Sequence, residues 1–282
     1  MKKMLLLGAL CLGQSTVLFA QENKALSGSA QYRVKEGDVV QGQAKEYKTR
    51  LANTADQKVT IMLDAGNLKI EGYNGNELII QTTARIEAPP ERAKGLRSLY
   101  NSAVDNTGLG LAVTSENGGI RIENASRKTV PYTIRVPQKA AILYEQTNWG
   151  AGGVTVQNVD GDLEIRTKNG DINLLNVTGP VVANTTNGEV KVVYSTLNQS
   201  KPTAISTISG AIDVSLPAAT KANFKLSSIN GEMYTDFDLG LTKKDGLTRM
   251  GGGHVINGAA NGGGVDLQLK TISSDIYIRK QK

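Results

Sequence analysis

Apolar and polar residues alternate along most of the chain, and between residues 150 and 193 this alternation restarts every nine residues. A glycine stands at each restart, and the second and fourth residues after it are apolar. The glycines are Gly152, Gly161, Gly170, Gly179 and Gly188, and the apolar pairs are Val154/Val156, Leu163/Ile165, Ile172/Leu174, Val181/Ala183 and Val190/Val192. A fixed period with strand-like alternation is typical of repeat architectures, and each strand buries one face.

Each nine-residue step has room for a short strand and a turn, so two steps predict one eighteen-residue coil of a narrow β-solenoid. The apolar positions point inward, and the glycines permit a positive φ at the corners. The chain is therefore expected to be all-β, a solenoid-like repeat domain of the β-helix or β-roll type. The clearest repeats are residues 150–193.

Strand-like alternation also surrounds the repeats, from residue 58 to residue 136 and from residue 212 to the C-terminus. The Gly- and Lys-rich stretch 242–264 is expected to be a long exposed loop. The last strand, which carries Arg279 and Lys280, is expected to protect an exposed sheet edge.

One segment departs from the β pattern. Residues 90–103 begin with proline and carry Leu96, Leu99 and Tyr100 at helical spacing. This pattern predicts one short helix near residues 90–103, packed on the sheet as a cap.

The first twenty residues have the pattern of a secretory signal peptide. Lys2 and Lys3 precede an apolar run, and Ala20 precedes the expected cleavage point. A retained membrane anchor is the alternative, although the run is shorter than the roughly 20 residues that a spanning helix needs. The only cysteine, Cys11, lies inside this segment, where the preceding Leu10 does not suit lipid attachment.

Three parts are therefore expected: a signal peptide (1–20), a loosely ordered leader (21–44) and a single β-repeat domain (45–282). The protein is expected to be exported to the periplasm, the cell surface or the medium, with no transmembrane segment after cleavage.

The charge is only mildly basic. Without Lys2 and Lys3, 30 basic residues face 26 acidic ones, and no basic cluster indicates a nucleic-acid partner. Aromatic residues make up 5% of the chain, which fits a thin core of Val, Ile and Leu.

Few residues suit catalysis or metal binding. His254 is the only histidine, and the expected mature chain has no cysteine, so no catalytic residue, metal site or cofactor is predicted. Asp160, Asp162 and Asp171 lie near the corners, where paired carboxylates could serve glycosidase chemistry or calcium binding. Other corners lack such pairs, so these residues are interpreted as turn formers.

The repeats resemble a known family. The segments 159–165, 169–172, 177–181 and 187–190 share a polar-Gly-acidic-aliphatic pattern, and residues 132–137 precede them. Together they resemble the putative-adhesin family of bacterial envelope proteins with β-strand repeats, over roughly residues 58–280. The resemblance implies adhesion by analogy and supplies no catalytic or binding residues.

A non-enzymatic envelope protein with a binding or structural role is therefore expected, with an unknown protein or glycan partner. Tyr144, Trp149 and Tyr194 are the candidate contact residues, because aromatic side chains are enriched at contact sites; capping the core is their alternative role. Two other functions stay open: a periplasmic scaffold or sensing module, and a secreted carbohydrate-active enzyme on a β-helix.

Overall fold

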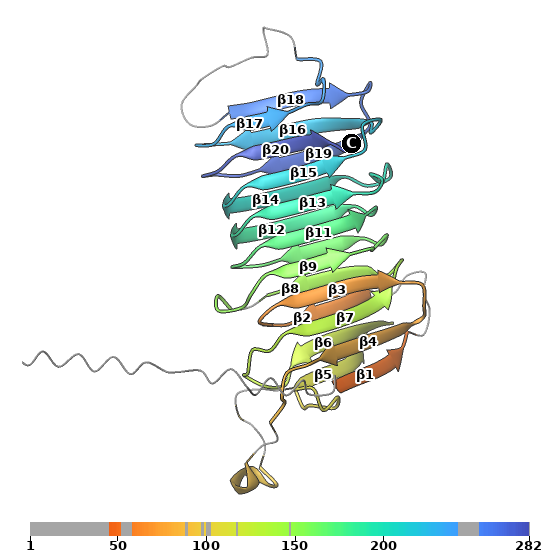
Figure 1. Ribbon diagram of the computed structural model, residues 1–282, viewed down its shortest axis with the longest axis vertical. Helices are drawn as coiled ribbons and strands as arrows, with labels where there is room; N and C mark the ends of the chain where they lie inside the picture. The colour runs from red at the N-terminus through yellow and green to blue at the C-terminus, as the bar shows by residue number, and fades with distance from the viewer. Residues whose placement is uncertain are drawn as a thin grey trace, which may run out of the picture. The chain divides into compact units, whose positions relative to one another are not determined.

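The computed structural model describes residues 45–51, 58–87, 90–96, 99, 103–116, 118–146, 148–241 and 254–281. The expected signal peptide and leader lie outside these residues. Residues Gln41–Lys282 form one compact unit, in which the described strands make two ten-stranded sheets (Figure 1).

Within each sheet the spatial order of the strands differs from their order in the chain. From edge to edge, sheet A contains β1 (Lys45–Arg50), β4 (Glu77–Thr82), β7 (Tyr132–Pro137), β3 (Leu68–Tyr73), β9 (Val154–Gln157), β11 (Ile172–Val177), β13 (Val190–Tyr194), β15 (Ile212–Leu216), β20 (Ile276–Lys280) and β17 (Met233–Thr235). Sheet B contains β18 (His254–Ala260), β16 (Ala222–Ser228), β19 (Val265–Lys270), β14 (Thr203–Ser209), β12 (Val181–Asn187), β10 (Leu163–Arg166), β8 (Ala141–Glu145), β2 (Lys58–Met62), β6 (Gly119–Asn124) and β5 (Leu111–Glu116).

The nine-residue period is one crossing from sheet to sheet. Successive strands of the repeat alternate between sheets A and B, and positions eighteen residues apart pair in parallel. Leu163 pairs with Val181 in sheet B, and Ile172 pairs with Val190 in sheet A. The inward residues of both sheets form one apolar core, in which these four side chains are at most 2% exposed. The all-β, solenoid-like architecture and the inward register are confirmed.

The corner glycines are needed mainly because successive coils approach closely. An ideal Cβ at Gly179 would lie 2.0 Å from the carbonyl oxygen of Gly161, and one at Gly161 would lie 2.1 Å from that of Ala140. Among the five glycines of the period, φ is positive only at Gly170 and Gly188. The expectation of a positive φ at every corner is therefore wrong, and lack of space for a side chain explains the others.

Two coils are inserted out of sequence order. β2 and β3 lie between the coil β6–β7 and the coil β8–β9, although they precede both in the chain. β19 and β20 likewise lie between the coil β14–β15 and the earlier strands β16 and β17. Figure 1 shows both insertions as breaks in the order of the colours.

Strands at three of the four sheet edges pair antiparallel with their neighbours. β1 pairs with β4, β5 with β6, and β18 with β16. The fourth edge is β17, which is parallel to β20 and only three residues long. Short edge strands discourage pairing with other chains.

The structure corrects the three expectations for irregular or terminal segments. Among the described residues of 90–103, the one regular element is a 3₁₀ turn, Glu91–Ala93, followed by Gly95 at φ 80°. Leu96 and Leu99 are 74% and 88% exposed, so they do not pack as a cap; Tyr100 lies outside the described residues. The turn ends there because Gly95 adopts a left-handed conformation, which breaks a helix.

The stretch 242–264 is a loop only in part, because His254–Ala260 forms β18 against β16; residues 242–253 lie outside the described residues. The last strand, β20, lies between β15 and β17, so the expectation that it forms a sheet edge is wrong.

Candidate functional site

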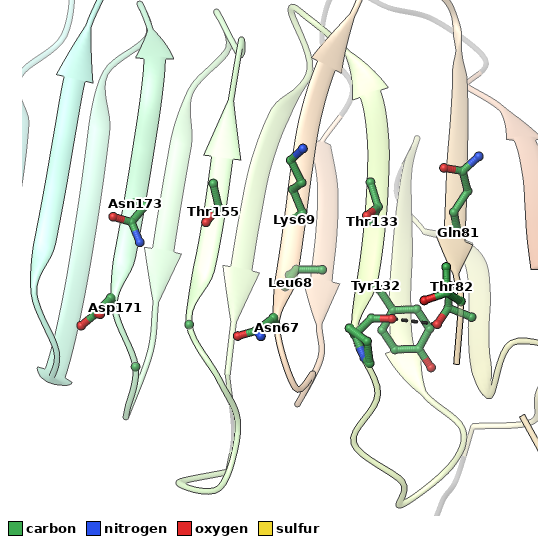
Figure 2. A pocket seen from close by; sticks show the side chains of 14 residues that line it. Asn67, Leu68, Lys69, Gln81, Thr82, Tyr132, Thr133, Thr155, Asp171 and Asn173 are labelled. Carbon is green, nitrogen blue, oxygen red and sulfur yellow. Dashed lines mark hydrogen bonds between the residues drawn. The ribbon is translucent and has the colours of Figure 1, made fainter. Parts of the chain in front are cut away.

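A groove of about 640 Å³ crosses the outer face of sheet A. It spans five neighbouring strands, β4, β7, β3, β9 and β11, near one end of each (Figure 2). The lining residues are Asn67, Leu68, Lys69, Gln81, Thr82, Thr83, Pro131, Tyr132, Thr133, Gly153, Thr155, Gly170, Asp171 and Asn173.

Five outward side chains form one continuous row across the groove. Each is the direct cross-strand neighbour of the next, and together they are Gln81, Thr133, Lys69, Thr155 and Asn173. Figure 2 shows these side chains side by side on the same face. Because parallel and antiparallel neighbours lie about 4.8 Å apart, the row presents a polar group at every strand step.

Three members of this row are free to bind a ligand. The side chains of Thr133, Thr155 and Asn173 have no hydrogen-bond partner among the residues that the structure describes. Hydroxyl and amide groups both donate and accept hydrogen bonds. The row can therefore bind an uncharged ligand that carries many donors and acceptors.

The β4 end of the groove and its charged groups are held by internal bonds. Gln81 Nε2 donates to Glu46 Oε2 at 2.7 Å, and Thr82 Oγ1 donates to the Pro131 carbonyl at 2.8 Å. Lys69 forms an ion pair with Glu71. Asp171 Oδ1 accepts the backbone N–H of Glu189 at 2.9 Å. The charged groups are thus already partnered, and the site carries little net charge.

Two of the three predicted contact residues are not exposed. Tyr144 and Tyr194 are both 0% exposed, so the expectation of exposure is wrong for them. Tyr144 Oη donates to the Leu63 carbonyl at 3.2 Å, and Tyr194 Oη lies 3.4 Å from Thr203 Oγ1. Burial raises the pKa of both phenols, which stay neutral core residues.

Trp149 is the exposed member of the three, at 50%. It lies in the turn between β8 and β9, where its carbonyl accepts a hydrogen bond from Asn169 Nδ2 at 3.2 Å. It is outside the residues that line the groove. Sequence reasoning missed the groove because it searched for aromatic residues, whereas the row consists of the ordinary polar positions of the alternation.

The corner carboxylates form bonds to other coils. Asp160 Oδ1 accepts from Thr178 Oγ1 at 2.7 Å, and Asp162 Oδ2 lies 2.6 Å from Lys201 Nζ. His254 pairs with Ser228 in the β18–β16 ladder. Within the described residues, no group of three or more His, Cys, Asp or Glu side chains is arranged to hold a metal ion.

No helix in the described part of the chain has the length and apolarity needed to cross a membrane.

Three solved structures resemble the chain at 11–12% identity. A "putative cell adhesion protein" from Clostridium sporogenes has 11% identity and a TM-score of 0.46, covering 85% of this chain and 100% of its own. A "putative adhesin" from Bacteroides fragilis has 12% identity and a TM-score of 0.34, covering 85% and 97%. A "putative lipid binding protein" from Parabacteroides distasonis has 12% identity and a TM-score of 0.27, covering 86% and 98%.

None of the curated proteins matches the chain. A family model does match, over residues 21–279, and its description is Toastrack DUF4097. This match extends over nearly all of the strands in both sheets. The chain belongs to the Toastrack DUF4097 family, as the resemblance of its repeats to putative adhesins leads one to expect.

Proposed function

We propose that the protein is an exported, non-catalytic binding protein of the bacterial cell envelope, and that the groove on sheet A is its ligand surface. The observation that carries this proposal is the row of Thr133, Thr155 and Asn173, whose polar side chains have no partner in the described structure. Ligand sites are typically concave, with a few convergent polar groups, and this row lies in such a hollow.

The groove suits an extended, uncharged ligand, such as a glycan or an unfolded peptide. Its two charged groups are occupied, Lys69 by Glu71 and Asp171 by the Glu189 N–H. A charged ligand would have to break those bonds, whereas hydroxyl or amide groups need only the free row.

Binding is tested with residues 21–282 on arrays of glycans and of short peptides. Wild-type protein is compared with a Thr155→Ala, Asn173→Ala double variant. The control is Lys191→Ala, which changes the next residue of the same cross-strand row, beyond the groove. The double variant is expected to lose binding by about tenfold or more, since each lost hydrogen bond contributes about 1 kcal/mol.

The control variant is expected to bind as the wild type does. Equal binding by the double variant, or no binding by the wild type on either array, would contradict the groove as the ligand surface.

Export is tested separately by adding protease to intact cells and then fractionating them. Export rests on the signal-like pattern of residues 1–20. Cleavage on intact cells would favour an adhesin at the surface. Protection until the outer envelope is opened would favour a periplasmic scaffold or sensing module. Recovery of uncleaved chain with its first twenty residues in the cytoplasm would rule export out.

A further inference from the structure

Two tyrosine rings stack on the outer face of sheet A, at the edge opposite β1. Tyr234 of β17 and Tyr277 of β20 are direct cross-strand neighbours. Their ring centroids are 5.4 Å apart and their planes differ by 11°. Neither residue lines the groove.

The inner ring, Tyr277, is held in place by two charged side chains. Its hydroxyl donates to Asp275 Oδ2 at 2.9 Å, and the Arg279 guanidinium lies 5.1 Å from its ring centroid. Arg279 Nε in turn donates to Asp213 Oδ1 at 3.0 Å. A group held by several partners loses little conformational freedom when a ligand binds.

The acidic partner of Tyr277 is also fixed. Asp275 Oδ1 accepts the backbone N–H of Glu232 at 2.8 Å. The hydrogen bond from Glu232 and that from the Tyr277 hydroxyl lower the pKa of Asp275, so it is an ionised acceptor near neutral pH. Charged hydrogen-bonding groups therefore surround the tyrosine stack.

The outer ring, Tyr234, is 53% exposed. Because Tyr277 covers one of its faces and β17 is the edge strand, the other face of the ring points beyond the sheet. An open aromatic face that is already held in place suits the apolar C–H face of a pyranose, which can stack on the ring.

We propose that the Tyr234–Tyr277 stack is a carbohydrate-binding platform, with one sugar ring stacked on the free face of Tyr234. The platform stands on its own observations and does not need the groove to bind the same ligand.

The surroundings argue against the two other uses of an exposed aromatic edge. β17 is only three residues long, which is too short to give an added strand a useful hydrogen-bonded ladder. A lipid surface is disfavoured because the patch is rich in carboxylates: Asp213 lies on β15, Glu232 directly precedes β17 and Asp275 directly precedes β20.

The test is a glycan array with residues 21–282 and three variants. Tyr234→Ala removes the platform, and Tyr234→Phe keeps the ring without its hydroxyl. Ile208→Ala is the control, because Ile208 is 46% exposed but lies on β14 in the other sheet. Circular dichroism melting of each variant checks that the fold is kept.

Wild type, Tyr234→Phe and Ile208→Ala are expected to retain the same glycans. Tyr234→Ala is expected to bind them at least about tenfold more weakly, as the loss of a stacked aromatic contact predicts. Absence of any glycan binding by a folded wild type overturns the proposal, and so does unchanged binding by Tyr234→Ala.

The groove and the platform can fail independently. If the Thr155→Ala, Asn173→Ala variant loses glycans and Tyr234→Ala does not, the groove stands and the platform is wrong. The reverse pattern supports the platform and contradicts the groove.

Discussion

At the scale of single residues, the corner glycines show how closely successive coils stack. At most of them the restriction is not the backbone conformation but the carbonyl oxygen of the preceding coil. Gly179 would place a Cβ 2.0 Å from the Gly161 oxygen, which no real side chain tolerates. A regular glycine period in a sequence can therefore indicate that successive coils stack closely.

Gly179→Ala is expected to lower the free energy of unfolding by at least about 1–3 kcal/mol, because the two coils must move apart. Gly66→Ala is the control, since its nearest atoms would lie 3.7 Å from the new Cβ and its φ is not positive. That variant should be neutral or gain up to about 1 kcal/mol from the less flexible unfolded chain. Urea unfolding measures both; a Gly179→Ala protein as stable as Gly66→Ala would contradict the stacking argument.

Buried threonine hydroxyls form hydrogen bonds at another corner of the solenoid. Thr207 Oγ1 donates to the Gly188 carbonyl at 3.3 Å, and Thr271 Oγ1 donates to the Gly210 carbonyl at 3.1 Å. Thr167 is also buried, but its Oγ1 has no partner within the described residues. The same residue type at the same kind of position is therefore bonded in one coil and unbonded in another.

Replacing these threonines by valine separates the two cases. Thr271→Val should cost about 1 kcal/mol, because the partly buried Gly210 carbonyl loses its donor. Thr167→Val should be neutral or stabilising, because it removes an unsatisfied buried hydroxyl. Thermal melting of the two variants compares them directly, and an equal loss of stability in both would show that the Thr167 hydroxyl is satisfied in solution.

Tyr144 and Tyr194 show what residue-level reasoning could have found. Each continues an inward alternation, Tyr144 two residues after Ile142 and Tyr194 two residues after Val192. The period of two predicts that both tyrosine side chains point inward. It is a better guide to their burial than their aromatic character is. Trp149 follows no such alternation, and it is the exposed one.

At the scale of strands, the sequence predicts which segments are strands and which residues face inward, but not every neighbour. One coil can pair with any other coil of the same register, because parallel pairing uses backbone groups that every residue carries. The insertion of β19–β20 beside β14–β15, and the groove formed by β4, β7, β3, β9 and β11, both depend on that choice. Local pattern contains no signal for it.

Engineered disulfides test the insertion, since residues 21–282 contain no cysteine. Ala204→Cys with Gln268→Cys joins direct neighbours on β14 and β19, within disulfide reach. Ala204→Cys with Lys225→Cys joins β14 to β16 across the intervening β19, a separation of about 10 Å. Mass spectrometry after mild oxidation should find the first cross-link and not the second. The opposite result would mean that the coils follow sequence order.

At the scale of the whole folded unit, the insertions connect segments that are distant in the chain. Residues 58–73 lie between coils formed by residues 119–137 and 141–157, and residues 265–280 lie between coils formed by residues 203–216 and 222–235. Simple solenoids depend on nearest-neighbour contacts, which allows their ends to unfold separately. In this chain each inserted coil lies between two coils from other parts of the sequence. It is therefore held on both sides only when both of those coils have folded.

This connection predicts that the unit unfolds in one cooperative transition, although it is built from repeats. Trp149, the only tryptophan, reports on the turn between β8 and β9, while far-ultraviolet circular dichroism reports on all strands. The urea transition followed by Trp149 fluorescence should coincide with the one followed by circular dichroism, which is the usual test of two-state behaviour. A Trp149→Phe, Tyr277→Trp variant moves the probe to β20 at the other end and should give a transition that coincides with its own circular dichroism. Separate midpoints for the two tryptophan positions, each measured against circular dichroism, would show instead that the ends unfold independently and that the inserted coils add no cooperativity.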